Sequence, residues 1–181
     1  MNDALQLTLH NLLVRRPDLA GLIVFLANDL LFLMVAALLV TMLVFRTRLT
    51  WRWWAIAATA AVLCLLLAKV GGVLVADERP YLAGHYTPIT HVANDNGFPS
   101  DHGLASSLTT LVAWPLNRAV AVAFGVLTLV IMAGRLTIGA HHTLDVLGSA
   151  FIAAVAVAIV TLIPWPAAWE SRARARRVRA Q

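Results

Sequence analysis

Charged side chains are scarce in this sequence. Aspartate, glutamate, lysine and arginine make up 13% of the 181 residues, whereas hydrophobic residues make up 60%. Soluble globular domains usually contain about 25% charged residues. The mean hydropathy of +0.79 points the same way. The composition therefore excludes an ordinary soluble domain and indicates a protein embedded in a membrane.

Cysteine is scarcer still. The single cysteine, Cys64, has no disulfide partner within the chain, which excludes a fold stabilised by internal disulfides. It lies in an apolar run, where we expect a small packing residue. A zinc site needs three or four closely arranged ligands, but the sequence has no His-x-x-x-His pattern and no cysteine pair. We therefore expect no metal and no other cofactor.

Apolar runs dominate what is present. About 20 residues cross a hydrocarbon core of about 30 Å, and the third and fourth runs are short for this purpose. Residues 1–19 mix leucines with polar residues, which is typical of an interfacial amphipathic helix. We predict an all-α integral membrane protein, a bundle of about five to six transmembrane helices with an N-terminal interfacial helix. The runs cover roughly 20–45, 53–76, 103–115, 119–134 and 144–163.

Basic residues gather in two regions, the first connection with Arg46, Arg48 and Arg52 and the arginine-rich tail. Basic residues beside spans stay in the cytoplasm. With five crossings, the 77–102 loop and the segment around His141 then face outward. Arg15 and Arg16 oppose this orientation only weakly.

Residues 1–165 are expected to form a single membrane-embedded domain, and residues 166–181 a basic, disordered cytoplasmic tail. Such a tail could bind nucleic acid, but it follows a membrane span and contains Trp169, with Trp165 just before it. This setting favours contact with anionic membrane lipids, so we expect membrane lipids and no nucleic acid as partners.

Three polar segments interrupt the apolar runs: Arg79-Pro80, 98–103 and 134–145. If the chain is helical from His141 onward, His141 and Asp145 share one face, and the carboxylate can orient the imidazole. Such a histidine can attack phosphorus or transfer a proton.

The remaining polar residues of these segments fit a phosphate pocket. Arg79 and Arg135 each offer a planar fork of donors to phosphoryl oxygens. Ser100 is a candidate N-cap, and the N–H groups of residues 101–103 would add an anion site at a helix N-terminus. Each residue also has a structural explanation when considered alone. Asp145 would be a negative charge at a helix N-terminus, which the helix dipole stabilises. The arginines would extend from the ends of the spans to the membrane surface.

Together the segments resemble the signature of the type 2 phosphatidic acid phosphatase superfamily, Lys-x6-Arg-Pro, Pro-Ser-Gly-His and Ser-Arg-x5-His-x3-Asp. The resemblance runs from Lys69 to Asp145, less than half of the chain. It implies a metal-independent enzyme in which His141 forms a phosphohistidine, Asp145 orients it and His102 is the general acid. The residues implied in phosphate binding are Arg79, Ser100, Arg135, Lys69, Asp101 and Gly103.

The sequence departs from the signature at two positions. Gly134 replaces the serine before Arg135, and Gly72 occupies the lysine position, three residues after Lys69. Four further polar residues match no position of the family and could contact a lipid head group; they are His85, His91, Asp95 and His142.

Asp101 in place of glycine, within the run Phe98-Pro99-Ser100-Asp101-His102, resembles the bacterial undecaprenyl-diphosphate phosphatases of the bacitracin-resistance type. This resemblance implies hydrolysis of undecaprenyl diphosphate in the bacterial plasma membrane, and with it recycling of the lipid carrier of peptidoglycan biosynthesis. One alternative is a phosphatase for phosphatidic acid or phosphatidylglycerophosphate. The other is a non-catalytic protein that binds or transports lipid phosphates, for which the arginines alone would suffice.

Overall fold

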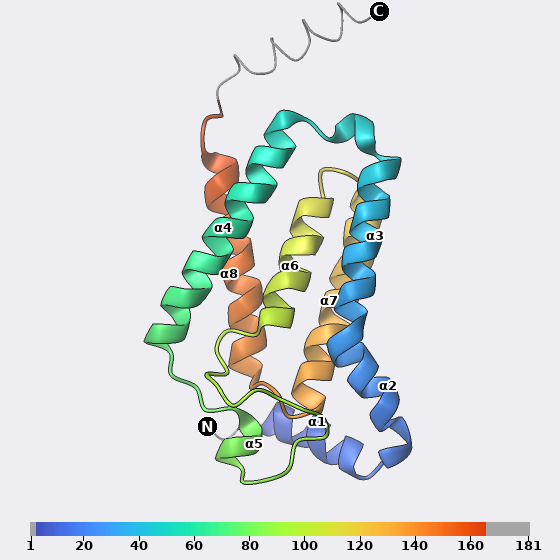
Figure 1. Cartoon of the computed structure of the whole chain (residues 1–181), viewed down its shortest axis with the longest axis vertical. Helices are drawn as coiled ribbons and strands as arrows, with labels where there is room; N and C mark the ends of the chain where they lie inside the picture. The colour runs from blue at the N-terminus through green and yellow to red at the C-terminus, as the bar shows by residue number, and fades with distance from the viewer. Residues whose placement is uncertain (1–2, 166–181) are drawn as a thin grey trace, which may run out of the picture.

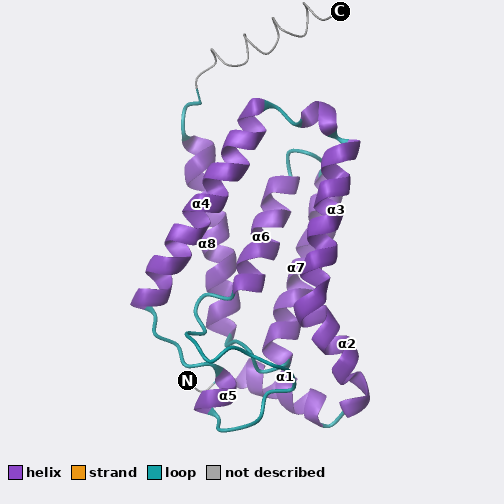
Figure 2. Ribbon diagram, viewed as in Figure 1, coloured by secondary structure: helices purple, strands orange, loops and turns teal. Residues whose placement is uncertain are grey.

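The computed structural model describes residues 3–165, and every regular element in that range is a helix (Figures 1 and 2). The predicted all-α fold is confirmed. The elements are α1 (Ala4–Val14), η1 (Pro17–Leu19), α2 (Ala20–Val24), the π-helical η2 (Phe25–Asp29), α3 (Leu30–Val44), η3 (Arg46–Arg48), α4 (Trp51–Leu74), α5 (Pro80–Ala83), α6 (Asp101–Ala113), α7 (Arg118–Thr137) and α8 (Thr143–Leu162).

Four helical segments in the described residues are long and apolar enough to cross a membrane: Pro17–Val44, α4, α7 and α8. The helix α6 has only 13 residues, as its short apolar run predicts. The predicted shortness of the fourth run is wrong, because α7 has 20 residues. The apolar run stops at Gly134, but the helix continues through Arg135, whose side chain is buried inside the protein.

The short helix α6 lies at the centre of the bundle, packed against α7 and α8 (Figure 1). Alanines along α8 let α4 and α6 approach it. One buried cluster joins Cys64 of α4, Leu104 of α6, and Ala153 and Ala156 of α8. Cys64 is thus a small packing residue, as expected.

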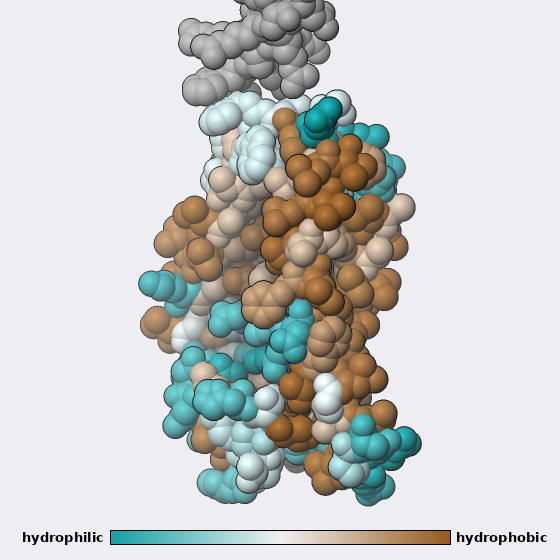
Figure 3. Space-filling view, turned by 45° about the vertical axis from the view of Figure 1, so that its right-hand side comes forward, coloured by the Kyte–Doolittle hydropathy of each residue, from teal (hydrophilic) through white to brown (hydrophobic). Residues whose placement is uncertain are grey.

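The two ends of the bundle differ in character. At one end α4 and α7 stop and α6 and α8 begin, and the short helices α1 and α5 lie across this end (Figure 1). Hydrophilic residues gather at this end and reach into the otherwise apolar face of the molecule (Figure 3). The opposite end holds η3, the 114–117 connection and the end of α8. The predicted basic tail, 166–181, lies outside the described residues.

The N-terminal helix α1 is attached to the bundle beneath α7. Gln6 is 1% exposed, and its amide group donates to the Leu136 carbonyl at 3.3 Å. The carboxylate of Asp3 accepts from the backbone N–H of Thr143 at 2.5 Å, at the first residue of α8. The predicted N-terminal helix is therefore present, and its polar contacts are made with the ends of the two helices that flank His141 and with the Tyr86 hydroxyl.

Candidate active site

His141 lies in the short connection between α7 and α8 and is 3% exposed. Its Nδ1 is 2.9 Å from the Gly97 carbonyl oxygen and 3.4 Å from a carboxylate oxygen of Asp145. A carbonyl oxygen only accepts, so Nδ1 carries the proton and Nε2 carries the lone pair. The chain is not helical from His141, because α8 begins at Thr143 with His142 as its N-cap. The nearest partner of the imidazole is therefore the Gly97 carbonyl, in the loop before α6.

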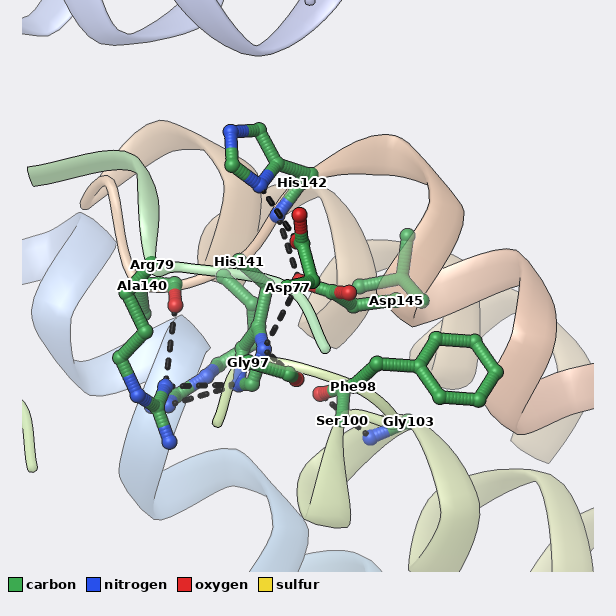
Figure 4. A network of polar contacts seen from close by, with 12 residues as sticks. Asp77, Arg79, Gly97, Phe98, Ser100, Gly103, Ala140, His141, His142 and Asp145 are labelled. Atoms are coloured by element: carbon green, nitrogen blue, oxygen red, sulfur yellow. Dashed lines mark hydrogen bonds and ion pairs between the residues drawn. The ribbon is translucent and has the colours of Figure 1, made fainter. Parts of the chain in front are cut away.

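Two guanidinium groups converge on Nε2 of this histidine. Nη1 of Arg79 lies 3.4 Å from it and Nη2 of Arg135 lies 3.3 Å from it. Figure 4 shows the Arg79 side chain pointing toward His141, with a second bond to the Ala140 carbonyl. Both arginines are buried, at 6% and 8% exposure. The lone pair thus faces two guanidinium groups whose N–H donors can bind an anion.

Burial and positive charge keep this imidazole neutral. The loss of water around His141, followed by the charges of Arg135 and Arg79, lowers its pKa from 6.5 to about 3. Nε2 is therefore unprotonated at neutral pH, as a nucleophile must be.

Arg135 is held by a residue that lies outside the three polar segments of the sequence. Its Nη1 donates to the side-chain carbonyl of Asn28, which lies in the π-helical turn η2. Single π-helical turns often occur at functional sites. A side chain at Gly134 would meet Ala27 backbone atoms at 3.0 and 3.1 Å, so the absent serine makes room for η2. Asn28 thereby supplies a polar partner for Arg135 from an element that packs closely against Gly134.

The loop before α6 fixes Arg79 from outside. The Nε and Nη2 atoms of Arg79 donate to one carboxylate oxygen of Asp95 at 2.9 and 2.6 Å. The Asp95 side chain is 64% exposed, whereas that of Arg79 is 8% exposed. Asp95 thus occupies two of the donors that the sequence assigned to phosphate, and it does so from the solvent side.

The start of α6 is built around Ser100. As N-cap it accepts from the Gly103 N–H at 3.3 Å, and its own N–H donates to the Asp145 carbonyl at 3.2 Å. The Gly103 N–H is consequently engaged within the protein. A Cβ at Gly103 would collide with the Ser149 hydroxyl of α8, so this glycine serves the close approach of two helices. His102 lies near the Asn28 backbone and within electrostatic reach of Arg135 and His141.

A second histidine–carboxylate pair lies behind the first. Nδ1 of His142 is 2.6 Å from the Asp77 carboxylate, and the His142 N–H donates to Asp145 at 2.8 Å (Figure 4). Burial raises the pKa of Asp77, and the Asp145 carboxylate adds to this shift, while His142 opposes it. Among the described residues, His142, Asp77 and Asp145 place ligand atoms within 4.8 Å of one another. However, one carboxylate oxygen of Asp145 already contacts the His141 ring and the His142 N–H. The other carboxylate oxygen is buried without a hydrogen-bond partner.

A cavity of ≈570 Å³ opens beside Arg79, between α4 and α6. Lys69, Arg79 and Asp101 line it together with apolar side chains of both helices. At the lysine position of the signature, Gly72, a side chain would be tightly placed, because its Cβ would lie 3.1 Å from the Phe98 carbonyl oxygen. Lys69, about one helical turn earlier, lines the cavity instead.

The structure thus brings most of the predicted residues to one end of the bundle. His85 and His91 are exposed and lie outside the contacts described above. Sequence reasoning missed Asn28, the Gly97 carbonyl and Asp77. The available signals were an asparagine within the apolar run 20–45 and an aspartate directly after the run 53–76.

No curated protein and no solved structure matches this chain. A family model does match, the PAP2 superfamily, over residues 51–169, which is more than half of the sequence. Membership of that superfamily suggests a phosphatase that acts on lipid phosphates. The matched segment contains both arginines, His102, His141 and Asp145. The chain belongs to the PAP2 superfamily.

Proposed function

We propose that this protein hydrolyses undecaprenyl diphosphate to undecaprenyl phosphate and inorganic phosphate through a phosphohistidine on His141. The observation that supports this most strongly is the convergence of Arg79 and Arg135 on a neutral Nε2 whose ring is oriented from Nδ1. A protein that only bound lipid phosphates would need the two cations, but not an oriented nucleophile between them.

In the first step Nε2 of His141 attacks the terminal phosphorus, and the bond to the bridging oxygen breaks. Burial, followed by the charges of Arg135 and His141, lowers the pKa of His102 from 6.5 to about 4 in the free protein, so His102 takes up its proton when the anionic head group binds. It then donates this proton to the departing oxygen of undecaprenyl phosphate. Arg79 and Arg135 bind the equatorial phosphoryl oxygens, where negative charge accumulates. Phosphorylation makes the imidazole cationic, and Asp145, 3.4 Å from Nδ1, stabilises that charge.

In the second step water replaces the histidine. His102, now neutral, accepts a proton from the attacking water, and the P–N bond breaks. Inorganic phosphate leaves, and His141 returns to its neutral form with the proton on Nδ1. No step requires a metal ion, because the two guanidinium groups supply the positive charge.

The cavity between α4 and α6 supports a lipid substrate. Its polar wall, with Lys69 and Arg79, continues into an apolar wall that includes Leu65 of α4 and Leu104 of α6. A head group at the arginines would leave the prenyl chain between these helices. Lys69 and Asp101 would then contact the second phosphate or its surroundings.

We propose further that residues 1–165 form one phosphatase domain in the bacterial plasma membrane, with the active site facing outward and residues 166–181 in the cytoplasm. The first connection, with η3, and the end of α8 lie at the same end of the bundle, opposite the α7–α8 connection (Figure 1). A basic tail that follows α8 would then start on the same side as Arg46, Arg48 and Arg52, as the positive-inside rule requires of cytoplasmic segments.

The test is phosphate release by the purified protein in detergent with EDTA, on undecaprenyl diphosphate, phosphatidic acid and phosphatidylglycerophosphate. We expect the diphosphate to react fastest; equal or reversed rates favour the alternative lipid phosphatases. Acid-labile phosphate should be trapped on the wild type and on His91→Ala, a control in the exposed loop, but not on His141→Ala. Label on His141→Ala, or no turnover of any lipid by the wild type, would refute the mechanism.

A further inference from the structure

A second cavity lies at the end of the bundle opposite the active site. It has a volume of ≈650 Å³, within the range of pockets that hold small ligands. Its walls come from the starts of α4 and the ends of α6 and α8, and most of them are apolar. The side chains that the following argument uses are Arg48, Arg52, Trp53, Ala57, Leu111 and Trp114.

The cavity is a consequence of the short central helix. With 13 residues, α6 spans about 20 Å, whereas the hydrocarbon core is about 30 Å thick. Because α6 begins at the active site, the missing length falls at the opposite end. There the α6–α7 connection and Trp53, whose indole N–H donates to the Val112 carbonyl at 3.0 Å, close only part of the space.

The mouth of the cavity is positively charged. Arg48 and Arg52 line it, and Arg46 and Arg118 lie at the same end. Segments 45–60, 108–125 and 153–165, which form this end in the described part of the chain, contain no Asp or Glu. Arg48 donates to the Leu116 carbonyl at 2.6 Å, which fixes its position in the loop. Within residues 3–165, Arg52 has neither a hydrogen-bond nor an ion-pair partner.

The surroundings belong at a membrane surface. Trp54 and Trp114 are 48% and 51% exposed at this end, and tryptophans gather where the hydrocarbon core meets the head groups. An apolar cavity with arginines at the boundary between hydrocarbon and head groups is complementary to a lipid, because the cavity can hold an acyl chain and the arginines can bind its phosphate. The chain beyond residue 165 is rich in arginine and would be repelled by Arg48 and Arg52.

We infer that this cavity is a binding site for an anionic glycerophospholipid of the leaflet opposite the active site. One acyl chain fills the space below α6, and the phosphate is bound by Arg52 and the free donors of Arg48. The lipid completes the packing of α4, α6 and α8, so it stabilises the folded bundle. This site shares no residue with the proposed catalytic pocket.

Thermal unfolding of the full chain in neutral detergent tests the site. Phosphatidylglycerol should raise Tm, whereas phosphatidylcholine with the same acyl chains and soluble glycerol phosphate should not. In Arg52→Gln the lipid concentration for half of the effect should rise about tenfold, as expected for the loss of a charged hydrogen bond. Arg118→Gln, which removes an arginine at the same end but outside the cavity, should leave that concentration unchanged.

Two further variants separate the cavity from other lipid contacts. Ala57→Phe fills the cavity and should abolish the effect, whereas Ala58→Phe, on the exposed side of α4, should retain it. Arg79→Gln should also retain it, because Arg79 lies at the other end. Equal effects of the two phospholipids, equal losses in Arg52→Gln and Arg118→Gln, or an undiminished effect in Ala57→Phe would each overturn the inference.

Discussion

Gly134→Ser would restore the residue that the superfamily signature has before the arginine, yet we expect it to damage this protein. A Cβ at position 134 would lie 3.0 Å from Cα and 3.1 Å from N and Cβ of Ala27. Carbon atoms in contact are normally about 3.5–4.0 Å apart. Most of these neighbours are backbone atoms of η2, which cannot rotate aside, so α7 and η2 must separate by about 0.5 Å.

The expected loss follows from the packing and from the hydrogen bond beside it. Overpacking of a well-packed contact lowers the free energy of unfolding by about 1–3 kcal/mol, which for a chain of this size lowers Tm by about 2–10 °C. The same displacement moves Asn28 away from Arg135, whose Nε is already buried without a partner. We therefore expect turnover to fall about tenfold to hundredfold as the guanidinium group leaves its position.

Thermal unfolding and phosphate release on one preparation measure both effects. Gly125→Ser is the matched control, because it lies in the same helix and its Cβ would meet only the Thr110 Cγ2, at 3.7 Å. Gly134→Ser should lose both stability and turnover relative to Gly125→Ser. If the two variants have the same Tm and the same turnover, Gly134 is not required for the approach of η2, and the explanation of the missing serine is wrong.

Three further predictions concern the same pocket and its orientation. Lys69→Met should lower turnover by about one to two orders of magnitude, as expected from losing a few kcal/mol of charge stabilisation, while Lys69→Arg should retain most of it; full activity of the Met variant would make Lys69 structural. Arg79→Gln removes a positive charge that disfavours protonation of His141, so the pKa of His141 should rise from about 3 toward 6.5. The acid limb of kcat/KM should then move to higher pH, and an unchanged limb in Arg79→Gln would contradict the assignment of His141 as the neutral nucleophile. With Cys64 replaced by alanine, Thr87→Cys at the active-site end should react with an impermeant thiol reagent in intact cells, and Thr47→Cys in η3 only after permeabilisation; the reverse pattern would invert the proposed topology.

The fold was largely predictable because membrane helices are specified by composition. Apolar runs located every long helix, and Ser100 marked the start of α6 through its capping side chain. The sequence failed at the end of α7, where Arg135 continues the helix instead of ending it. Local hydropathy treats an arginine as a boundary, whereas in this structure partners distant in the sequence keep it inside the protein.

The site was predictable only where residues lie in fixed spacing. His141 and Asp145 are near in the chain and were paired from the sequence, although the helix begins after His141. Asn28 contacts Arg135 across more than a hundred residues, and the Gly97 carbonyl is a backbone group with no side chain to mark it. Contacts of these two kinds depend on how helices cross, which a single sequence does not encode in any local pattern.

The ion pair between Arg79 and Asp95 gives the anion site an internal competitor. Any incoming anion must displace a carboxylate that already accepts two hydrogen bonds, and its apparent affinity is reduced by the fraction of molecules in which Asp95 remains bound. A ligand with a single weakly basic oxygen gains little from that exchange. One with several phosphoryl oxygens engages Arg79 and Arg135 together and releases Asp95 to water, where most of its side chain already lies. Discrimination among anions would then be set by the displacement of Asp95 as well as by the dimensions of the pocket.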